Sequence, residues 1–160
     1  MVCYPWFCRT YHWDDELNHK HLRNIKNTSK GDYNCGGYAL GTFSWYQPVF
    51  EDSDFEFGFD CEEEAVAKTN ECVYVMLREF RLRNIREIAS ISELKKNEYA
   101  FAFRLSSDGD FHYIKRYSNG HWYHKRGNSS IIEQISSYEV FHSIWCDRYD
   151  GPIVLMAVKK

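Results

Sequence analysis

The chain has 160 residues, of which 44% are hydrophobic and 27% charged, so we expect one domain whose core needs no disulfide or metal. Its net charge of −3 argues against a dedicated nucleic-acid binder. No stretch predicts a membrane span, and residues 1–16 lack the pattern of a signal peptide. We therefore expect a cytoplasmic protein, in the producing cell or in a host that it enters, with no membrane partner.

The amino-terminal residues 1–33 are polar and aromatic with little periodicity, which predicts an irregular lead-in to a single domain spanning 1–160. Six cysteines are spaced too irregularly for a disulfide framework, and in a cytoplasm we expect mostly free thiols: Cys3, Cys8, Cys35, Cys61, Cys72 and Cys146. A zinc interpretation would use residues near the amino end: Cys3, Cys8, His12, His19 and His21. Their spacing does not match a standard zinc knuckle, so we expect no metal and no cofactor.

A first helix is predicted from Cys35 to about Trp45, within the stretch that begins GDYNCGGYALG at residue 31. A polar loop ends at Asn34, and small and then apolar residues follow. The helix should end before Pro48, because the residue preceding a proline is disfavoured in the helical region.

A second helix is the clearest element of the pattern. Asp60 can cap it, and Glu63 follows three residues later in a capping-box arrangement. Apolar residues then recur at helical spacing: Val66, Val73, Met76, Leu77 and Phe80. Acids crowd its start and arginines its end, which suits the helix dipole. The acidic segment 51–60 before it predicts a surface loop.

From Ile85 the pattern changes to short strands. Alternation along 98–105 sets Tyr99, Phe101, Phe103 and Leu105 on one face. Further strands are predicted at 110–117, at 121–125 and, as a closing buried strand, at 152–160. Helices followed by antiparallel strands predict an α+β fold.

Cys35 is positioned for nucleophilic chemistry if the first helix begins there. A helix amino terminus lowers the pKa of a thiol, and the thiolate is the nucleophile. The free N–H groups of that terminus can also stabilise an oxyanion. Gly36 and Gly37 would leave room for a substrate backbone. The competing interpretation is a buried structural cysteine, which is the commoner fate of a free cysteine.

A nucleophilic cysteine needs a base, and His112 and His124 are the candidates on neighbouring strands. A two-residue loop, 119–120, would put the two histidines on opposite faces of the hairpin. A three-residue loop, 118–120, with Gly120 left-handed, would make them diagonal neighbours on one face, about 7–8 Å apart at the backbone. The catalytic interpretation prefers the second register.

These motifs together, NCGGYAL and GDFHYIKRYSNGHWYHKRG, resemble the NlpC-like branch of the papain-like cysteine hydrolases and obscure bacterial and phage-encoded papain-like proteins. The resemblance covers roughly residues 33–45 and 98–127 and the closing strand. It implies a papain-like fold and a Cys-His-His triad in which Cys35 is the nucleophile, His112 the base and His124 the orienter. The implied reaction is amide or isopeptide cleavage, or acyl transfer, on a peptide or protein substrate.

The sequence departs from the family pattern beside the nucleophile. Asn34 and Gly36 replace the usual acid and serine, and the family's upstream tyrosine has only Tyr33 as a weak substitute. We group Tyr33, Asn34 and Gly36 as oxyanion or substrate-binding candidates. The departures favour, as the alternative, a catalytically silent papain-like module that binds a protein partner, such as a phage-type inhibitor or effector.

Two further alternatives stay open. Asp110 or His121 can replace His124 as the orienter of the base. The segments 81–86 and 115–126 mix basic with aromatic or apolar residues, as nucleic-acid binders do, but the preferred explanation is a solvated helix end and hairpin, so we do not expect a nucleic-acid partner.

Overall fold

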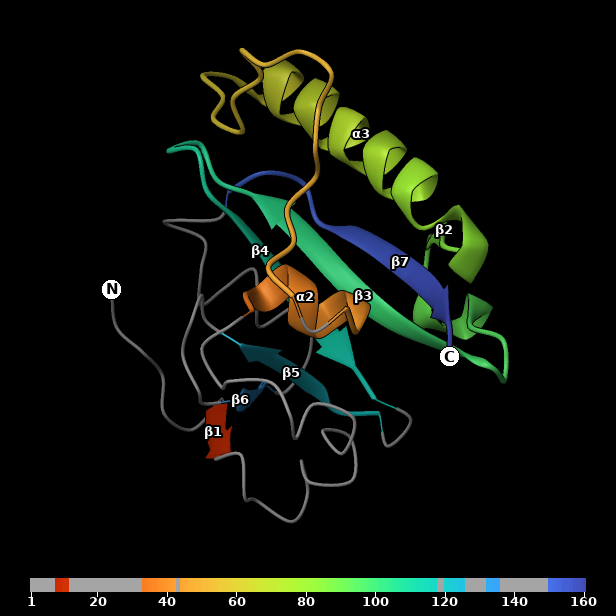
Figure 1. Cartoon of the computed structure of the whole chain (residues 1–160). Coiled ribbons are helices and arrows are strands. Elements are labelled where there is room, and N and C mark those ends of the chain that lie inside the picture. The colour runs from red at the N-terminus through yellow and green to blue at the C-terminus, as the bar shows by residue number, and fades with distance from the viewer. Residues whose placement is uncertain (1–7, 12–32, 43, 118–119, 126–131, 136–149) are drawn as a thin grey trace.

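The protein is an α+β domain in which one antiparallel sheet carries helices on one face (Figure 1). The computed structural model describes residues 8–11, 33–42, 44–117, 120–125, 132–135 and 150–160, with backbone only at 8–11 and 132–135. The helices are α2 (Cys35–Leu40) and α3 (Glu62–Glu79), with short 3-10 turns η2 (Arg81–Arg83) and η3 (Ile91–Glu93). The strands are β1 (Cys8–Tyr11), β2 (Arg86–Ile88), β3 (Glu98–Leu105), β4 (Phe111–Arg116), β5 (Trp122–Lys125), β6 (Ile132–Ile135) and β7 (Val154–Lys159).

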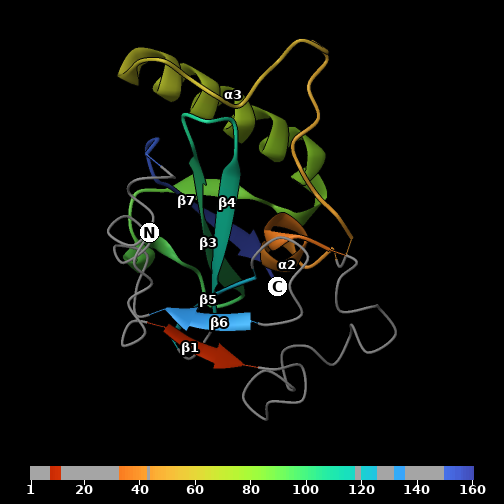
Figure 2. The same cartoon turned by 90° about the vertical axis from the view of Figure 1, so that its left-hand side faces the viewer.

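The seven strands lie in the order β1-β6-β5-β4-β3-β7-β2, and every neighbouring pair is antiparallel. The predicted α+β class is therefore confirmed. Strands β5, β6 and β1 lie side by side at one end of the sheet (Figure 2). None of the helices in the described ranges is long and apolar enough to cross a membrane.

The main core lies between the sheet and both helices. Its sheet side includes the face of β3 predicted from alternation: Tyr99, Phe101, Phe103 and Leu105. Helix α2 contributes Cys35, Ala39 and Leu40, and α3 contributes Cys72, Val73 and Met76. The opposite face of the sheet carries a second apolar cluster that includes Ala102, Ile114 and Trp122. Both faces of β3 are buried.

Helix α2 is shorter than predicted. It ends at Leu40 rather than near Trp45, because Gly41 adopts a left-handed conformation with φ 67°. The Gly41 N–H then bonds the carbonyls of Gly37 and Tyr38, which closes the last turn. The stop signal is this glycine and not Pro48.

Helix α3 begins one residue later than predicted. Its N-cap is Cys61, whose side chain makes no capping hydrogen bond, so the predicted capping box of Asp60 and Glu63 is wrong. Instead, the backbone N–H of Asp60 donates to Glu64 at 2.8 Å. Val66, predicted on the buried face, is 43% exposed.

The predicted strands after Ile85 are confirmed with small changes at their ends. Three strands had no predicted range: β2, just after Ile85; β6, after the 126–131 segment; and β1, which lies within residues 1–33, predicted to be irregular. The rest of that lead-in prediction, at residues 1–7 and 12–32, lies outside the described residues.

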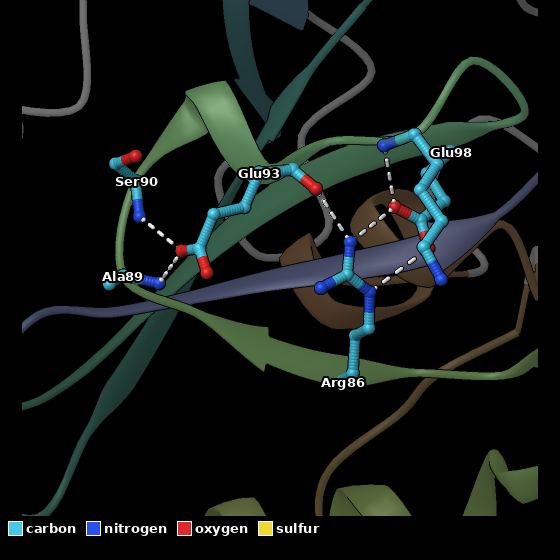
Figure 3. A network of polar contacts seen from close by, with 6 residues as sticks. Arg86, Ala89, Ser90, Glu93 and Glu98 are labelled. Carbon is cyan, nitrogen blue, oxygen red and sulfur yellow. Dashed lines mark hydrogen bonds and ion pairs between the residues drawn. The ribbon is translucent and has the colours of Figure 1, made fainter.

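A polar network joins the far edge of the sheet across β7 (Figure 3). Arg86 on β2 donates to both carboxylate oxygens of Glu98 on β3, at 2.8 and 3.1 Å, and to the carbonyl of Glu93 at 2.7 Å. The backbone N–H of Lys95 also donates to Glu98. The Arg86 bonds, and then the Lys95 N–H, lower the pKa of Glu98 to about 2.

Candidate functional site

The hairpin of β4 and β5 has the register that the catalytic interpretation preferred. Lys115 is opposite Tyr123 and Arg116 is opposite Trp122. The Tyr117 N–H donates to the His121 carbonyl at 3.0 Å, so three residues separate the paired positions. Gly120 has φ 84°, the left-handed conformation that closes such a loop. The alternative two-residue loop is excluded.

This register brings His112 and His124 into contact. Nε2 of His112 lies 2.7 Å from Nδ1 of His124, and both side chains are buried. The two rings meet edge to face, with centroids 5.0 Å apart. Continuing the register puts Ile114 opposite His124, so the two histidines are the diagonal pair that was expected.

The turn that leads into α2 is held by Asn34. Its side-chain oxygen accepts from the backbone N–H groups of Gly37 and Tyr46, both at 3.0 Å, and its amide donates to the Tyr46 carbonyl at 2.7 Å. Asn34 is therefore the N-cap of α2, and it also ties the returning chain to the helix start. Its side chain, a substrate-binding candidate by sequence, has a structural role here.

Cys35 is the first residue of α2, as predicted, and is 5% exposed. Burial raises the pKa of its thiol to about 12, which corrects the expectation that the helix start would lower it. Backbone N–H groups of Tyr113 and Gly36 and the ammonium of Lys125 act in the lowering direction, but desolvation is larger. Tyr113 immediately follows His112 on β4, so the thiol lies against this strand. Because side chains alternate along a strand, His112 shares the face of Ile114, opposite the face that Tyr113 and Cys35 share.

The two glycines after Cys35 make room for the protein's own atoms. A Cβ on Gly36 would lie 2.8 Å from the Tyr46 carbonyl oxygen and 3.3 Å from the Tyr113 ring. A Cβ on Gly37 would lie 2.0 Å from the Ser44 carbonyl oxygen. The expectation that they open a path for substrate is therefore wrong, because the segment 44–46 fills that space.

Lys125 is a site residue that the sequence reasoning missed. It follows His124 on β5 and is fully buried. Its ammonium donates to the Tyr33 carbonyl and lies 4.7 Å from the centroid of the Tyr33 ring. Tyr33 itself is fully buried. Alternation along β5 puts Lys125 on the face opposite His124, but no sequence signal showed that α2 would cover this face.

Four basic residues in the two segments considered for nucleic acid contact other groups of the protein. Lys115 lies between aromatic rings, 4.7 Å from the centroid of Tyr99, and Lys125 is buried. Arg83 donates to the Leu40 carbonyl, and Arg86 is paired with Glu98. These four cations are not displayed as a phosphate-binding surface would require.

Only some of the remaining predicted thiols and metal ligands lie in the part of the chain that the structure describes. Within the described residues, Cys35, Cys61 and Cys72 are free, and no group of three or more His, Cys, Asp or Glu side chains could hold a metal ion. The residues of the zinc interpretation, and Cys146, lie outside the described residues, except for the backbone of Cys8.

Comparison of the chain with protein-family models, with curated proteins and with solved structures gives no match. The resemblance to the NlpC-like branch therefore rests on the motifs around Cys35, His112 and His124 alone.

Proposed function

We propose that the protein is a papain-like cysteine hydrolase of the NlpC-like kind that cleaves an amide or isopeptide bond, or transfers the acyl group. The contact between His112 and His124 carries the proposal. A histidine buried in an aromatic strand usually bonds a backbone group or water, whereas here a second imidazole bonds it. A base oriented by a second side chain is the arrangement that nucleophilic catalysis requires.

The environment of Cys35 supports the same proposal. The thiol lies at the junction of α2 with β4, against the backbone N–H of the residue that follows His112. Because burial keeps the thiol protonated, the proposed reaction removes its proton during attack rather than before it. We assign that proton to His112, the imidazole that His124 bonds, and the assignment requires its ring to reach Sγ from the other face of β4.

In the proposed reaction Cys35 Sγ attacks the substrate carbonyl while His112 accepts the thiol proton. The Cys35 backbone N–H stabilises the oxyanion. Collapse of the tetrahedral intermediate expels the amine, which takes the proton from His112 and leaves a thioester on Cys35. Water, or an acceptor amine in acyl transfer, then attacks the thioester and returns the proton to Sγ. His124 holds the His112 ring in one tautomer throughout.

The same proposal includes a peptide or protein substrate, a cytoplasmic setting in the producing cell or a host, and no cofactor. A second candidate function is a silent papain-like module that binds a protein partner. The 5% exposure of Cys35 favours it, because a substrate carbonyl has to reach the thiol.

Acylation by p-nitrophenyl acetate separates the two functions. A hydrolase should release nitrophenolate and carry an acetyl group on Cys35, found by mass spectrometry of the digested protein. Cys35→Ala should abolish this acylation and His112→Ala should slow it at least 10-fold. Acetylation that is absent from Cys35, or unchanged in His112→Ala, would favour the binding module.

A further inference from the structure

Lys125 is a buried cation beside the proposed nucleophile. Lysine is almost never fully buried unless it is paired, yet the exposed fraction of Lys125 is 0%. Its position at the end of β5, next to His124, brings it to the side of the sheet that α2 covers. A buried charge of this kind must be stabilised by partner groups or serve a function.

The first partner of Lys125 is the backbone before the nucleophile. The ammonium donates to the Tyr33 carbonyl, two residues ahead of Cys35, and stacks over the Tyr33 ring. Asn34, between Tyr33 and Cys35, caps α2. The Lys125 ammonium and the Asn34 amide thus hold Tyr33 and the start of α2, which determine where Sγ of Cys35 lies.

The second partner is the Cys35 thiol itself. The charge of Lys125 lowers the pKa of Cys35, and Cys35 in turn raises the pKa of Lys125. Burial brings the pKa of Lys125 down to about 8, so the group is still largely protonated at neutral pH. The Asp110 carboxylate acts the other way and raises the pKa of Cys35. Among the described residues, Lys125 is the only side-chain cation whose charge lowers the pKa of Cys35.

We propose that Lys125 is a positioning residue for Cys35: it anchors the Tyr33 carbonyl and supplies the positive charge that stabilises the thiolate as the proton leaves. The inference rests on the proposed role of Cys35 as nucleophile. It adds a residue that lies outside the Cys-His-His set, and it gives the buried thiol a counter-ion.

The test is the rate of Cys35 alkylation by iodoacetamide at pH 7, where Lys125 is still largely protonated, read on the Cys35 peptide by mass spectrometry. Lys125→Met should slow this alkylation about 10-fold. Lys125→Arg, which keeps the charge, should recover most of the rate. The matched control is Lys115→Met. Lys115 is half-buried among aromatic rings and its pKa is also lowered to about 8, but it does not act on Cys35.

A second measurement does not depend on the folding of Lys125→Met. Because Lys125 loses its proton near pH 8, the rate of Cys35 alkylation in the unmodified protein should rise less steeply from pH 7 to pH 9 than that of Cys72. If Lys125→Met folds and leaves the rate of Cys35 alkylation at pH 7 unchanged, or if the two thiols gain equally from pH 7 to pH 9, the inference is overturned. A rate that depends on Lys125 without acylation by p-nitrophenyl acetate contradicts the proposed hydrolase alone.

Discussion

His112 Nε2 and His124 Nδ1 lie 2.7 Å apart in a buried contact between neighbouring strands. One of these nitrogens must carry a proton and the other must accept it, so the contact links the tautomers of both rings. If the His112 Nε2 donates, its Nδ1 is left as the acceptor that a thiol proton needs. The proposed chemistry requires this tautomer.

Replacing the second histidine should therefore impair the first. We expect His124→Ala to slow acylation of Cys35 at least 10-fold, and NMR of the His112 ring nitrogens to show a changed tautomer population. His121→Ala is the control, because His121 is exposed one residue before β5. Equal rates for the two variants would remove His124 from the site and restore Asp110 or His121 as orienter.

The Asn34 side chain should be important for stability. Asn34→Ala removes three hydrogen bonds, one that caps α2 and two that hold Tyr46, and should lower the free energy of unfolding by about 2–3 kcal/mol. Asn34→Asp keeps the accepting oxygen and should lose less. Urea denaturation measures both, with Asn70→Ala on the exposed face of α3 as the control. A loss for Asn34→Ala no larger than for Asn70→Ala would refute the cap's importance.

The glycines after Cys35 predict a difference between two alanine variants. Gly37→Ala puts a Cβ 2.0 Å from the Ser44 carbonyl oxygen, so backbone must move, and we expect a loss of at least about 2 kcal/mol in the free energy of unfolding. The Cβ of Gly41→Ala would make ordinary van der Waals contact with the Arg83 guanidinium, at 4.0 Å, but the residue must adopt φ 67°, which should cost about 1 kcal/mol. Thermal or urea unfolding gives the order; the reverse order would contradict the packing of segment 44–46.

The Arg86–Glu98 pair predicts how stability depends on pH. The pKa of Glu98 is about 2 in the folded protein and near 4.5 in the unfolded chain, so the pair stabilises fully above pH 4.5 and is lost as pH falls toward 2. Glu98→Gln should lower the free energy of unfolding at pH 7 by about 2 kcal/mol and have little effect at pH 2. Glu87→Gln, exposed on β2, is the control. An effect of Glu98→Gln that is the same at both pH values would rule out the ion pair as its source.

Local patterns in the sequence were sufficient for β3, β4, β5 and β7, but not for β1, β2 and β6. Alternation of apolar residues along β3 predicted its core face, and Gly120 allowed the three-residue loop, whose register the catalytic interpretation preferred and the structure has. Both features depend on residues that are close together in the sequence, and contacts with distant segments do not oppose them.

Features that depend on packing between distant segments were not predictable in the same way. The role of Gly36 and Gly37 depends on segment 44–46, which returns over α2. The burial of Cys35, which reverses the expected direction of its pKa, and that of Lys125 depend on how α2, β4 and β5 meet. No pattern within one segment of the sequence indicates how deeply a side chain will be buried. The end of α2 at Gly41 was missed for a different reason, since Pro48 offered a stronger signal farther on.

The proposal that His112 activates Cys35 is tested most directly by comparing two buried thiols in one molecule. Burial raises the pKa of both Cys35 and Cys72 to about 12, but Cys72 is on α3, whereas Cys35 lies against β4, the strand that carries His112. With iodoacetamide at pH 7 and the two peptides quantified together, Cys35 should react at least 10 times faster than Cys72, and His112→Ala should remove that advantage. Equal alkylation of Cys35 and Cys72 in the unmodified protein, or an advantage that survives in His112→Ala, would contradict the proposal.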